Sequence, residues 1–171
     1  MSRPATIAVQ PTDRLRLEPL RVEDADEMVE VLADARLYEF TGGSPPDVEE
    51  LRRRYRIQVA ELSPDGRETW LNWVVRLRSD GTAIGYVQAT LERASADAEV
   101  AWVVGRAWQG QGYASEAVAS MVTALRAAGT RRLVAHVKKD HLASRRVAER
   151  AGLSPTGTVV DHEEEWEWRA P

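Results

Sequence analysis

Hydrophobic and polar residues in the first third of the chain follow periods typical of one strand and two helices. Residues 14–20 alternate between polar and apolar side chains, which predicts a half-buried strand. Apolar residues then recur at helical spacing over residues 22–32, which predicts an amphipathic helix of about three turns. A capping Ser44, followed by two prolines in the first turn, predicts a second helix that runs to about Leu62.

The periodicity changes to that of strands after the turn sequence Ser-Pro-Asp-Gly at residues 63–66. Residues 70–77 and 83–91 predict an antiparallel hairpin, and residues 98–104 predict a further, mostly apolar strand. The remaining expected elements are a helix from about Ser115 to Gly129, a strand at 133–137, a short helix at 143–151, and closing strands at 156–160 and 164–168. The order β-α-α-β-β-β-α-β-α-β-β predicts a mixed α/β fold.

The composition narrows the class of protein. The 171 residues, 43% hydrophobic and 29% charged, predict one globular domain over residues 1–171, with residues 1–12 as a flexible N-terminal segment. The absence of cysteine excludes disulfides, thiolate zinc sites and a cysteine nucleophile. Residues 1–10 lack the apolar core of a signal peptide, and no later segment has the length of a membrane span, so we expect a cytoplasmic protein. The net charge of -4 argues against nucleic acid as a partner.

The stretch from Gln109 to Ala114, between an expected strand and an expected helix, is the strongest candidate for a binding site. Gly110 and Gly112 lack Cβ atoms, so consecutive backbone amides can approach a single anionic group. The following helix adds the positive end of its dipole. The pattern therefore indicates a phosphate or pyrophosphate site that needs no lysine. The alternative is a tight strand-to-helix connection without a ligand.

Other nucleotide and catalytic motifs fit poorly. A dinucleotide fingerprint requires glycine at position 115, which is serine, and a P-loop requires lysine at position 113, which is tyrosine. The His-Glu-Glu-Glu run at residues 162–165 lacks the second histidine of a zinc-protease motif, so we expect no metal site. The basic run Arg-Arg-Arg-Tyr-Arg at residues 52–56 is interpreted as a solvated helix face, with contact to an acidic substrate as the alternative.

The chain resembles the GNAT acetyltransferases over residues 99–119, EVAWVVGRAWQGQGYASEAVA, and in particular the branch that includes the ribosomal-protein N-terminal acetyltransferases. The family pattern Q/R-x-x-G-x-G/A is matched by Gln109, Gly112 and Ala114. The similarity extends to residues 14–20 and 143–153, and so covers nearly the whole chain. It implies a mixed, mostly antiparallel central sheet with helices on both faces.

This resemblance implies transfer of an acetyl group from acetyl-CoA, the co-substrate, to a primary amine by direct attack in a ternary complex. The amine would belong to a protein N-terminus or to a small molecule. The pyrophosphate of the coenzyme would lie on the amides of the turn, and its pantetheine arm would pair with the backbone of the preceding strand. The residues implied in coenzyme binding are Trp102, Val103, Val104, Gln109, Gly110, Gln111, Gly112, Tyr113, Ala114, His141 and Ser144. The expected partners are the amine acceptor and, as one option, a second copy of the chain.

Two residues are candidates for proton transfer. Glu99 lies where the family often has a glutamate base, in an apolar setting that would make it a better base; the alternative is a solvent-facing strand carboxylate. Ser144 is a candidate for a hydrogen bond to the coenzyme sulfur, or else a simple first-turn helix serine. Ala148 replaces the usual tyrosine acid of the family, and His141 stands where asparagine is common. These departures leave open a second hypothesis, in which the chain is a coenzyme A-binding sensor or interaction module without catalysis.

Overall fold

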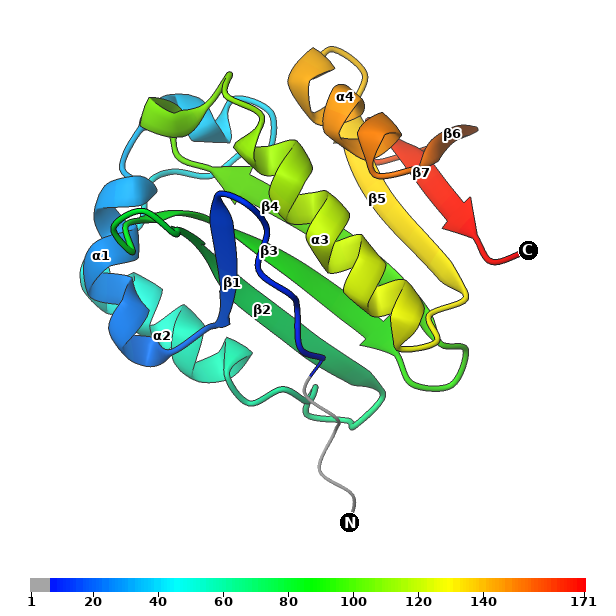
Figure 1. The fold of residues 1–171 in the computed structure, drawn as a ribbon, viewed down its shortest axis with the longest axis horizontal. Coiled ribbons are helices and arrows are strands. Elements are labelled where there is room, and N and C mark those ends of the chain that lie inside the picture. Colours follow the sequence, from blue (N-terminus) through cyan, green and yellow to red (C-terminus); the bar gives the residue numbers. More distant parts are fainter. Residues whose placement is uncertain (1–6) are drawn as a thin grey trace.

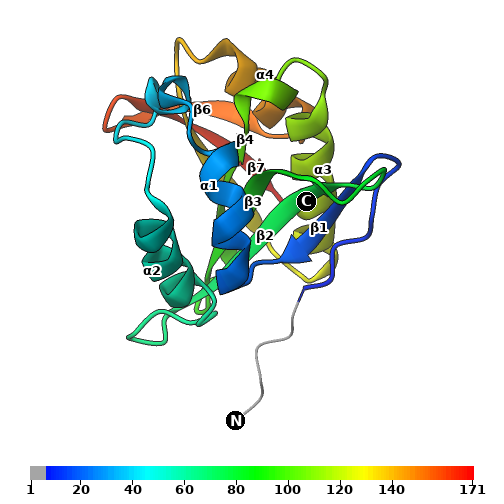
Figure 2. The same ribbon diagram turned by 90° about the vertical axis from the view of Figure 1, so that its left-hand side faces the viewer.

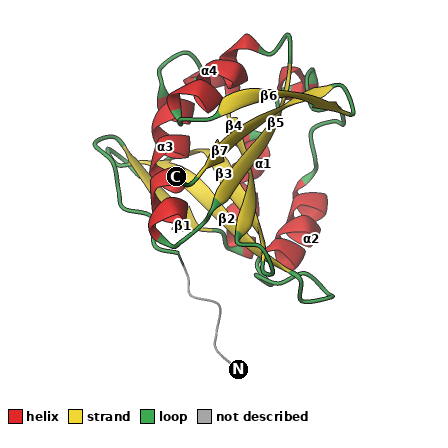
Figure 3. Cartoon of the chain, turned by 90° about the vertical axis from the view of Figure 1, so that its right-hand side faces the viewer, coloured by secondary structure: helices red, strands yellow, loops and turns green. Residues whose placement is uncertain are grey.

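A seven-stranded sheet crosses the middle of the molecule and carries helices on both faces (Figure 1 and Figure 3). The structure is a computed structural model that describes residues 7–171. Its strands are β1 (Leu15–Pro19), β2 (Glu68–Leu77), β3 (Ala83–Glu92), β4 (Asp97–Val104), β5 (Arg132–Lys138), β6 (Ser154–Val160) and β7 (Glu163–Arg169). Its α-helices are α1 (Ala25–Val31), α2 (Val48–Gln58), α3 (Tyr113–Ala127) and α4 (Leu142–Arg150). The predicted order of elements and the mixed α/β fold are confirmed.

Neighbouring strands follow the order β1-β2-β3-β4-β5-β7-β6, and each pair is antiparallel except β4 with β5. The parallel pair is short, because it runs only from Asp97 with Arg132 to Glu99 with Val134. Beyond Glu99 the two strands separate, while β4 continues beside β3. The sheet is therefore open along residues 100–104 of β4.

β3 and β4 approach each other closely near this opening. Gly85 on β3 is the partner of Val104 in the antiparallel register. A Cβ atom at Gly85 would lie 2.1 Å from the carbonyl oxygen of Val103, so only glycine permits this approach. The close packing fixes the end of β4, from which the glycine-rich turn begins.

Two apolar clusters fill the space between the sheet and the helices. On one face, α3 buries Met121 and Leu125 completely, and α4 joins the same cluster through Ala148. On the opposite face, α1 and α2 bury Met28 and Leu51 (Figure 2). Each large apolar side chain buried in this way contributes about 1.5–3 kcal/mol, so both helix pairs are held firmly on the sheet.

The second helix begins and ends at different residues from those predicted. Asp47, and not Ser44, is the N-cap of α2, since its Oδ1 accepts a hydrogen bond from the backbone N–H of Glu50 (2.8 Å). The two prolines precede the helix, because a residue that is followed by proline disfavours helical backbone angles. The helix ends at Gln58, whereas Leu62 forms an isolated bridge with Thr69.

The first helix and the N-terminal segment also differ from expectation. Val22–Asp24 form a separate 3-10 turn, so α1 is shorter than the predicted helix. Residues 1–6 of the expected flexible segment lie outside the described residues. Residues 7–12 have no regular secondary structure, yet Ile7 packs against the core. The hydroxyl of Ser120 on α3 also donates a hydrogen bond to the carbonyl of Gln10 (3.0 Å).

Candidate active site

The turn between β4 and α3 adopts a backbone conformation that favours glycine. A 3-10 turn (Arg106–Trp108) leads into Gly110 and Gly112, whose φ angles are +78° and +82°. Gly112 is the N-cap of α3, and amides at the start of a helix have no acceptor within the helix. Gln109 ties the turn to β4, because its Nε2 donates a hydrogen bond to the carbonyl of Val104 (2.9 Å). The turn therefore has the geometry of an anion-binding site.

Arg14, which precedes β1, connects the N-terminal part of the chain to this turn through hydrogen bonds and a cation–π contact. Its Nη1 donates to the carbonyl of Gln111 (2.9 Å), its Nε donates to Oε2 of Glu116 (2.7 Å), and its guanidinium lies 4.4 Å from the ring centroid of Tyr113. Burial alone would raise the pKa of Glu116, but hydrogen bonds from Thr12 and Arg14 outweigh it and lower that pKa. Sequence reasoning missed this role, because periodicity marks Arg14 only as an outward-facing strand residue.

A cavity of about 340 Å³, here called the turn cavity, opens between the turn and α4. It is lined by eight of the residues predicted to bind coenzyme: Val104, Gln109, Gly110, Gly112, Tyr113, Ala114, His141 and Ser144. Its other lining residues are Trp108, Ser115, Ala143, Arg146, Val147 and Arg150. Two arginines and no acidic residue of the described chain line the turn cavity, which suits a ligand that carries phosphate groups.

The other three predicted coenzyme-binding residues lie outside the turn cavity, as does Ala148, which stands in place of the family's usual tyrosine. Trp102 packs against the larger core cluster, and Val103 lines a cavity on the opposite face of the sheet. Both were predicted to bind through their backbone, and β5 does not pair with β4 at these positions. Gln111 contacts Arg14 through its carbonyl, and Ala148 is fully buried in the core, where it offers no proton donor.

Glu99 lies in a more polar setting than predicted. Its side chain is 62% exposed, and its Oε1 lies 3.1 Å from Nδ1 of His136 on β5. The expected apolar surroundings are therefore wrong, because the neighbouring strand contributes an imidazole. Glu99 is also the last residue of β4 that pairs with β5, which places it where the sheet begins to open.

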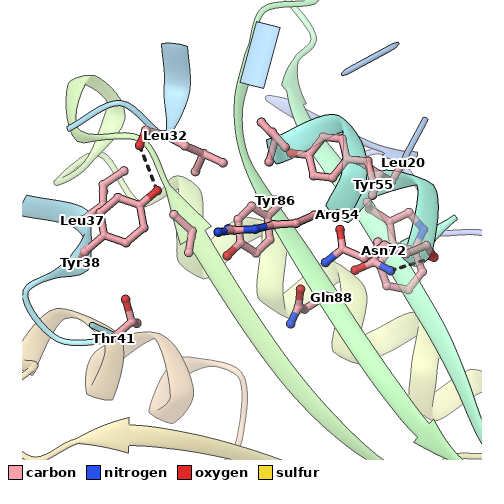
Figure 4. A pocket seen from close by; sticks show the side chains of 14 residues that line it. Leu20, Leu32, Leu37, Tyr38, Thr41, Arg54, Tyr55, Asn72, Tyr86 and Gln88 are labelled. Atoms are coloured by element: carbon pink, nitrogen blue, oxygen red, sulfur yellow. Dashed lines mark hydrogen bonds between the residues drawn. The ribbon is translucent and has the colours of Figure 1, made fainter. Parts of the chain in front are cut away.

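The second cavity, here called the tyrosine cavity, has a volume of about 150 Å³ and lies between α2, the segment after α1 and the sheet (Figure 4). Its apolar and aromatic lining consists of Leu20, Leu32, Leu37, Tyr38, Leu51, Tyr55, Trp73, Tyr86 and Val103. Its polar lining consists of Thr41, Arg54, Gln58, Asn72 and Gln88. Burial raises the pKa of all three tyrosines, so their hydroxyls stay protonated at neutral pH.

The end of β4 separates the two cavities. Val103 lines the tyrosine cavity, whereas the next residue, Val104, lines the turn cavity. A stacked ring pair, Phe40 with His141, also joins the segment beside the tyrosine cavity to the start of α4. Nε2 of His141 lies 3.4 Å from Oγ of Ser144, and burial lowers the pKa of this histidine. Two binding spaces thus meet across one strand end.

Two other kinds of feature, a metal site and a membrane-spanning helix, are not found in the part of the chain that the structure describes. No group of three or more His, Asp or Glu side chains among residues 7–171 is arranged to hold a metal ion. None of the helices in that range is both long enough and apolar enough to cross a membrane.

The sequence matches a protein family whose model is described as an acetyltransferase (GNAT) domain, over residues 14–154. The matched region begins just before β1 and ends where β6 starts, so it contains both cavities and the turn. No curated protein sequence matches the chain significantly.

Several solved structures share the fold. RimL, a ribosomal α-N-protein acetyltransferase in complex with coenzyme A, superposes with a TM-score of 0.80 and 17% identity, covering 94% of this chain and 97% of its own. An acetyltransferase from Agrobacterium tumefaciens gives a TM-score of 0.70 and 25% identity, with 99% and 96% coverage. AAC(6')-Ib, an aminoglycoside acetyltransferase, in complex with paromomycin and acetyl-CoA gives a TM-score of 0.75 and 18% identity, with 92% and 94% coverage.

Proposed function

Because the chain belongs to the GNAT acetyltransferase family, we propose that it transfers the acetyl group of acetyl-CoA directly to a primary amine while both substrates are bound. Membership of the family makes it an acetyl-CoA-dependent N-acetyltransferase. The meeting of two cavities at Val103 and Val104 carries the proposal of direct transfer, because one cavity suits a phosphate-bearing coenzyme and the other suits an organic acceptor. The sequence contains no cysteine that would carry an acetyl group between them.

In this proposal the coenzyme lies along the turn and the open part of β4. The amides of residues 109–114 hold its pyrophosphate, and Arg146 and Arg150 contact its other phosphate groups. The pantetheine arm follows Trp102, Val103 and Val104, where β5 leaves the strand without a second neighbour. The thioester then lies near the splayed centre of the sheet, where β4 and β5 separate beyond Glu99.

Proton transfer in the proposed reaction involves Glu99 and Ser144. A neutral amine attacks the carbonyl carbon of the thioester, the C–S bond breaks, and the new ammonium must lose a proton. Glu99 accepts this proton through water, with His136 beside it to pass the proton to solvent. The hydroxyl of Ser144 donates a hydrogen bond to the departing thiolate, which then takes a proton from solvent, and Nε2 of His141 lies 3.4 Å from that hydroxyl.

A thiol-release assay with acetyl-CoA and a panel of amines tests the proposal. We expect Glu99→Gln to lower kcat roughly 100-fold while coenzyme A affinity, measured by calorimetry, stays unchanged. Asp97→Asn, two residues earlier on β4, is the matched control and should retain activity. If the native protein binds coenzyme A but acetylates no amine above background, the sensor hypothesis replaces the enzyme.

Homodimer formation through β6 is a second part of the proposal. All residues of this edge strand are exposed, including Val159 at 49% and Val160 at 48%. An exposed edge strand with apolar side chains is a surface that readily pairs with another strand. Light scattering should give the mass of a dimer for the native chain and of a monomer for Val159→Lys. A monomeric native chain would refute this part.

A further inference from the structure

We infer that the acceptor is a small primary amine with an apolar body and one anionic group, a carboxylate or a phosphate, which Arg54 binds in the tyrosine cavity. This inference rests on the proposed acetyl transfer, because it assigns the acceptor class to the second of the two cavities. The fold alone does not select an acceptor, since the named structural neighbours include enzymes for a ribosomal protein and for aminoglycosides.

The charge of the tyrosine cavity is the first argument. Arg54 is the one charged side chain among the 14 residues that line it, and no aspartate or glutamate in residues 7–171 belongs to the lining. A polycationic acceptor would meet a like charge there and no carboxylate to neutralise it, which costs affinity. An acceptor with an anionic group meets a guanidinium instead.

The position of Arg54 is the second argument. In Figure 4 its side chain extends from α2 toward Tyr86, and about half of that side chain, at 51% exposure, remains open to solvent. The carboxylate that pairs with it is that of Glu50, four residues earlier on the same exposed helix face. Such a surface pair stabilises a helix by only about 0.3–0.5 kcal/mol, so it competes weakly with a ligand. A bound carboxylate or phosphate can instead accept two parallel hydrogen bonds from the guanidinium.

The other arginines of α2 differ from Arg54 in their contacts and in their position relative to the cavity. Arg52 pairs with Asp26 on α1 (2.5 Å) and with Glu49, so it joins two helices. Tyr55 is buried at 5% exposure and forms part of the cavity wall. The other three arginines of the run, Arg52, Arg53 and Arg56, do not belong to the lining. Of the basic run at residues 52–56, Arg54 is therefore the residue placed to bind a substrate.

The size and surface of the cavity define the rest of the acceptor. Its volume of about 150 Å³ is close to that of cavities that hold a single benzene ring. Leucine side chains and tyrosine rings supply an apolar wall, while the protonated hydroxyl of Tyr86 and the amide of Gln88 offer neutral hydrogen bonds. One small apolar body fits this space. A small molecule is therefore favoured over a folded protein as the acceptor.

Binding of four matched probes tests this inference without turnover. The probes are two anions, 3-phenylpropionate and 2-phenylethyl phosphate, the neutral 3-phenylpropanol, and the cationic 3-phenylpropylammonium. Each is added to protein that is saturated with coenzyme A. Tryptophan fluorescence reports binding, because Trp73 lines the cavity. We expect at least one anion to bind more than tenfold tighter than the alcohol, and the ammonium to bind weakest. The tighter of the two anions identifies carboxylate or phosphate as the preferred group.

Variants of α2 assign the preference to one residue. Arg54→Gln should remove the advantage of the anions, whereas Arg56→Gln, with the same change of charge on the exposed side of α2, should keep it. Glu50→Gln should strengthen anion binding two- to threefold, because it removes the competing carboxylate. The inference is overturned if the ammonium binds tightest, if no probe binds, or if the preference survives in Arg54→Gln.

A turnover experiment separates this inference from the proposed function. Acetylation of phenylalanine, phenylalaninamide, spermidine and a short peptide with an acidic N-terminus is compared for native protein and Arg54→Gln. We expect phenylalanine to be preferred, with KM raised at least tenfold in the variant and kcat changed little. A preference for spermidine or for the peptide overturns the inference but leaves acetyl transfer intact. Tight anion binding without acetylation of any amine overturns the proposed function, and Arg54 then remains the anion-binding residue of a cavity that holds no acceptor.

Discussion

Phe40 and His141 stack face to face, with ring centroids 4.0 Å apart and planes inclined by 4°. His141 lines the turn cavity, while Thr41, the residue after Phe40, lines the tyrosine cavity. The ring pair therefore joins the proposed coenzyme and acceptor sites at one contact. An aromatic contact of this kind contributes about 0.5–1.5 kcal/mol beyond the area that it buries.

The protonation of His141 should affect the pH dependence of stability. Burial lowers the pKa of His141 below its ordinary value of 6.5, although Asp140 acts in the opposite direction. The unfolded chain thus takes up this proton first as pH falls. The contribution of the neutral ring is complete above about pH 6.5 and is lost between the unfolded and the folded pKa. Urea unfolding from pH 8 to 5 should show a smaller loss of stability for His141→Gln than for the native chain.

The matched control for this experiment is His162→Gln. His162 is exposed in the turn between β6 and β7 and takes no part in the ring pair, so its replacement removes a histidine without changing that contact. An identical pH dependence for His141→Gln and native protein would contradict the expected proton linkage.

Glycine at position 112 should be required for coenzyme binding. Gly112→Ala places a Cβ atom at φ +82°, which costs about 1–2 kcal/mol or shifts the turn amides. We expect coenzyme A affinity, measured by calorimetry, to fall at least tenfold. Gly129→Ala at the other end of α3 is a matched control, because its φ is +95° and no atom lies within 4 Å of the added Cβ. It should lower stability similarly while binding coenzyme normally; an equal loss of binding in both variants would contradict this interpretation.

Arg14 should act on coenzyme binding from a distance. Arg14→Met keeps most of the aliphatic stem but removes the side-chain hydrogen bonds to Gln111 and Glu116 and the contact with the ring of Tyr113, while the backbone N–H of residue 14 still donates to Glu116. Losing these bonds should cost about 1–2 kcal/mol and weaken coenzyme A binding roughly 5- to 30-fold. Arg16→Met, on β1 and paired with nearby Glu18, should leave affinity unchanged. Native affinity in Arg14→Met would show that the turn holds its shape without this residue.

Gly85 should be required for stability. Its replacement by alanine would force a Cβ atom to within 2.1 Å of the Val103 carbonyl oxygen unless β3 and β4 move apart. We expect the free energy of unfolding to fall by about 2–3 kcal/mol in urea titrations. Gly81→Ala, in open space at the β2–β3 turn, should cost only about 1 kcal/mol through its φ of +80°. Equal effects of the two substitutions would argue against the close approach of the strands.

The order of elements was predictable because each element has its own period. The stripe of α3 and the alternation in β1 depend on neighbours in the sequence, and both appear in the structure. The start of α2 was predicted wrongly, because Ser44 and Asp47 are both good caps and only the folded backbone selects Asp47. Local preference therefore located elements better than it located their ends.

Features of the site that depend on distant contacts were not predictable in the same way. The glycine turn is contiguous, so its residues could be identified directly. Arg14 and Phe40 gain their roles from contacts with residues on α3 and at the start of α4. Arg54 appeared in the sequence only as one member of a basic run, and the fold distinguishes it from its neighbours by directing it into a cavity. Glu99 was placed on the expected strand, but its imidazole neighbour comes from β5.

The short pairing of β4 with β5 divides the sheet into two parts, β1 to β4 and β5 to β7, which are joined by only three residue pairs. A ligand that binds in the gap beyond Glu99 and contacts both parts binds only the folded chain. At a free ligand concentration [L], it raises the free energy of unfolding by RT ln(1 + [L]/Kd). At a hundredfold excess over Kd this shift is about 2.7 kcal/mol, a large part of the stability of an ordinary domain. The fraction of unfolded protein would then fall as the concentration of the co-substrate rises.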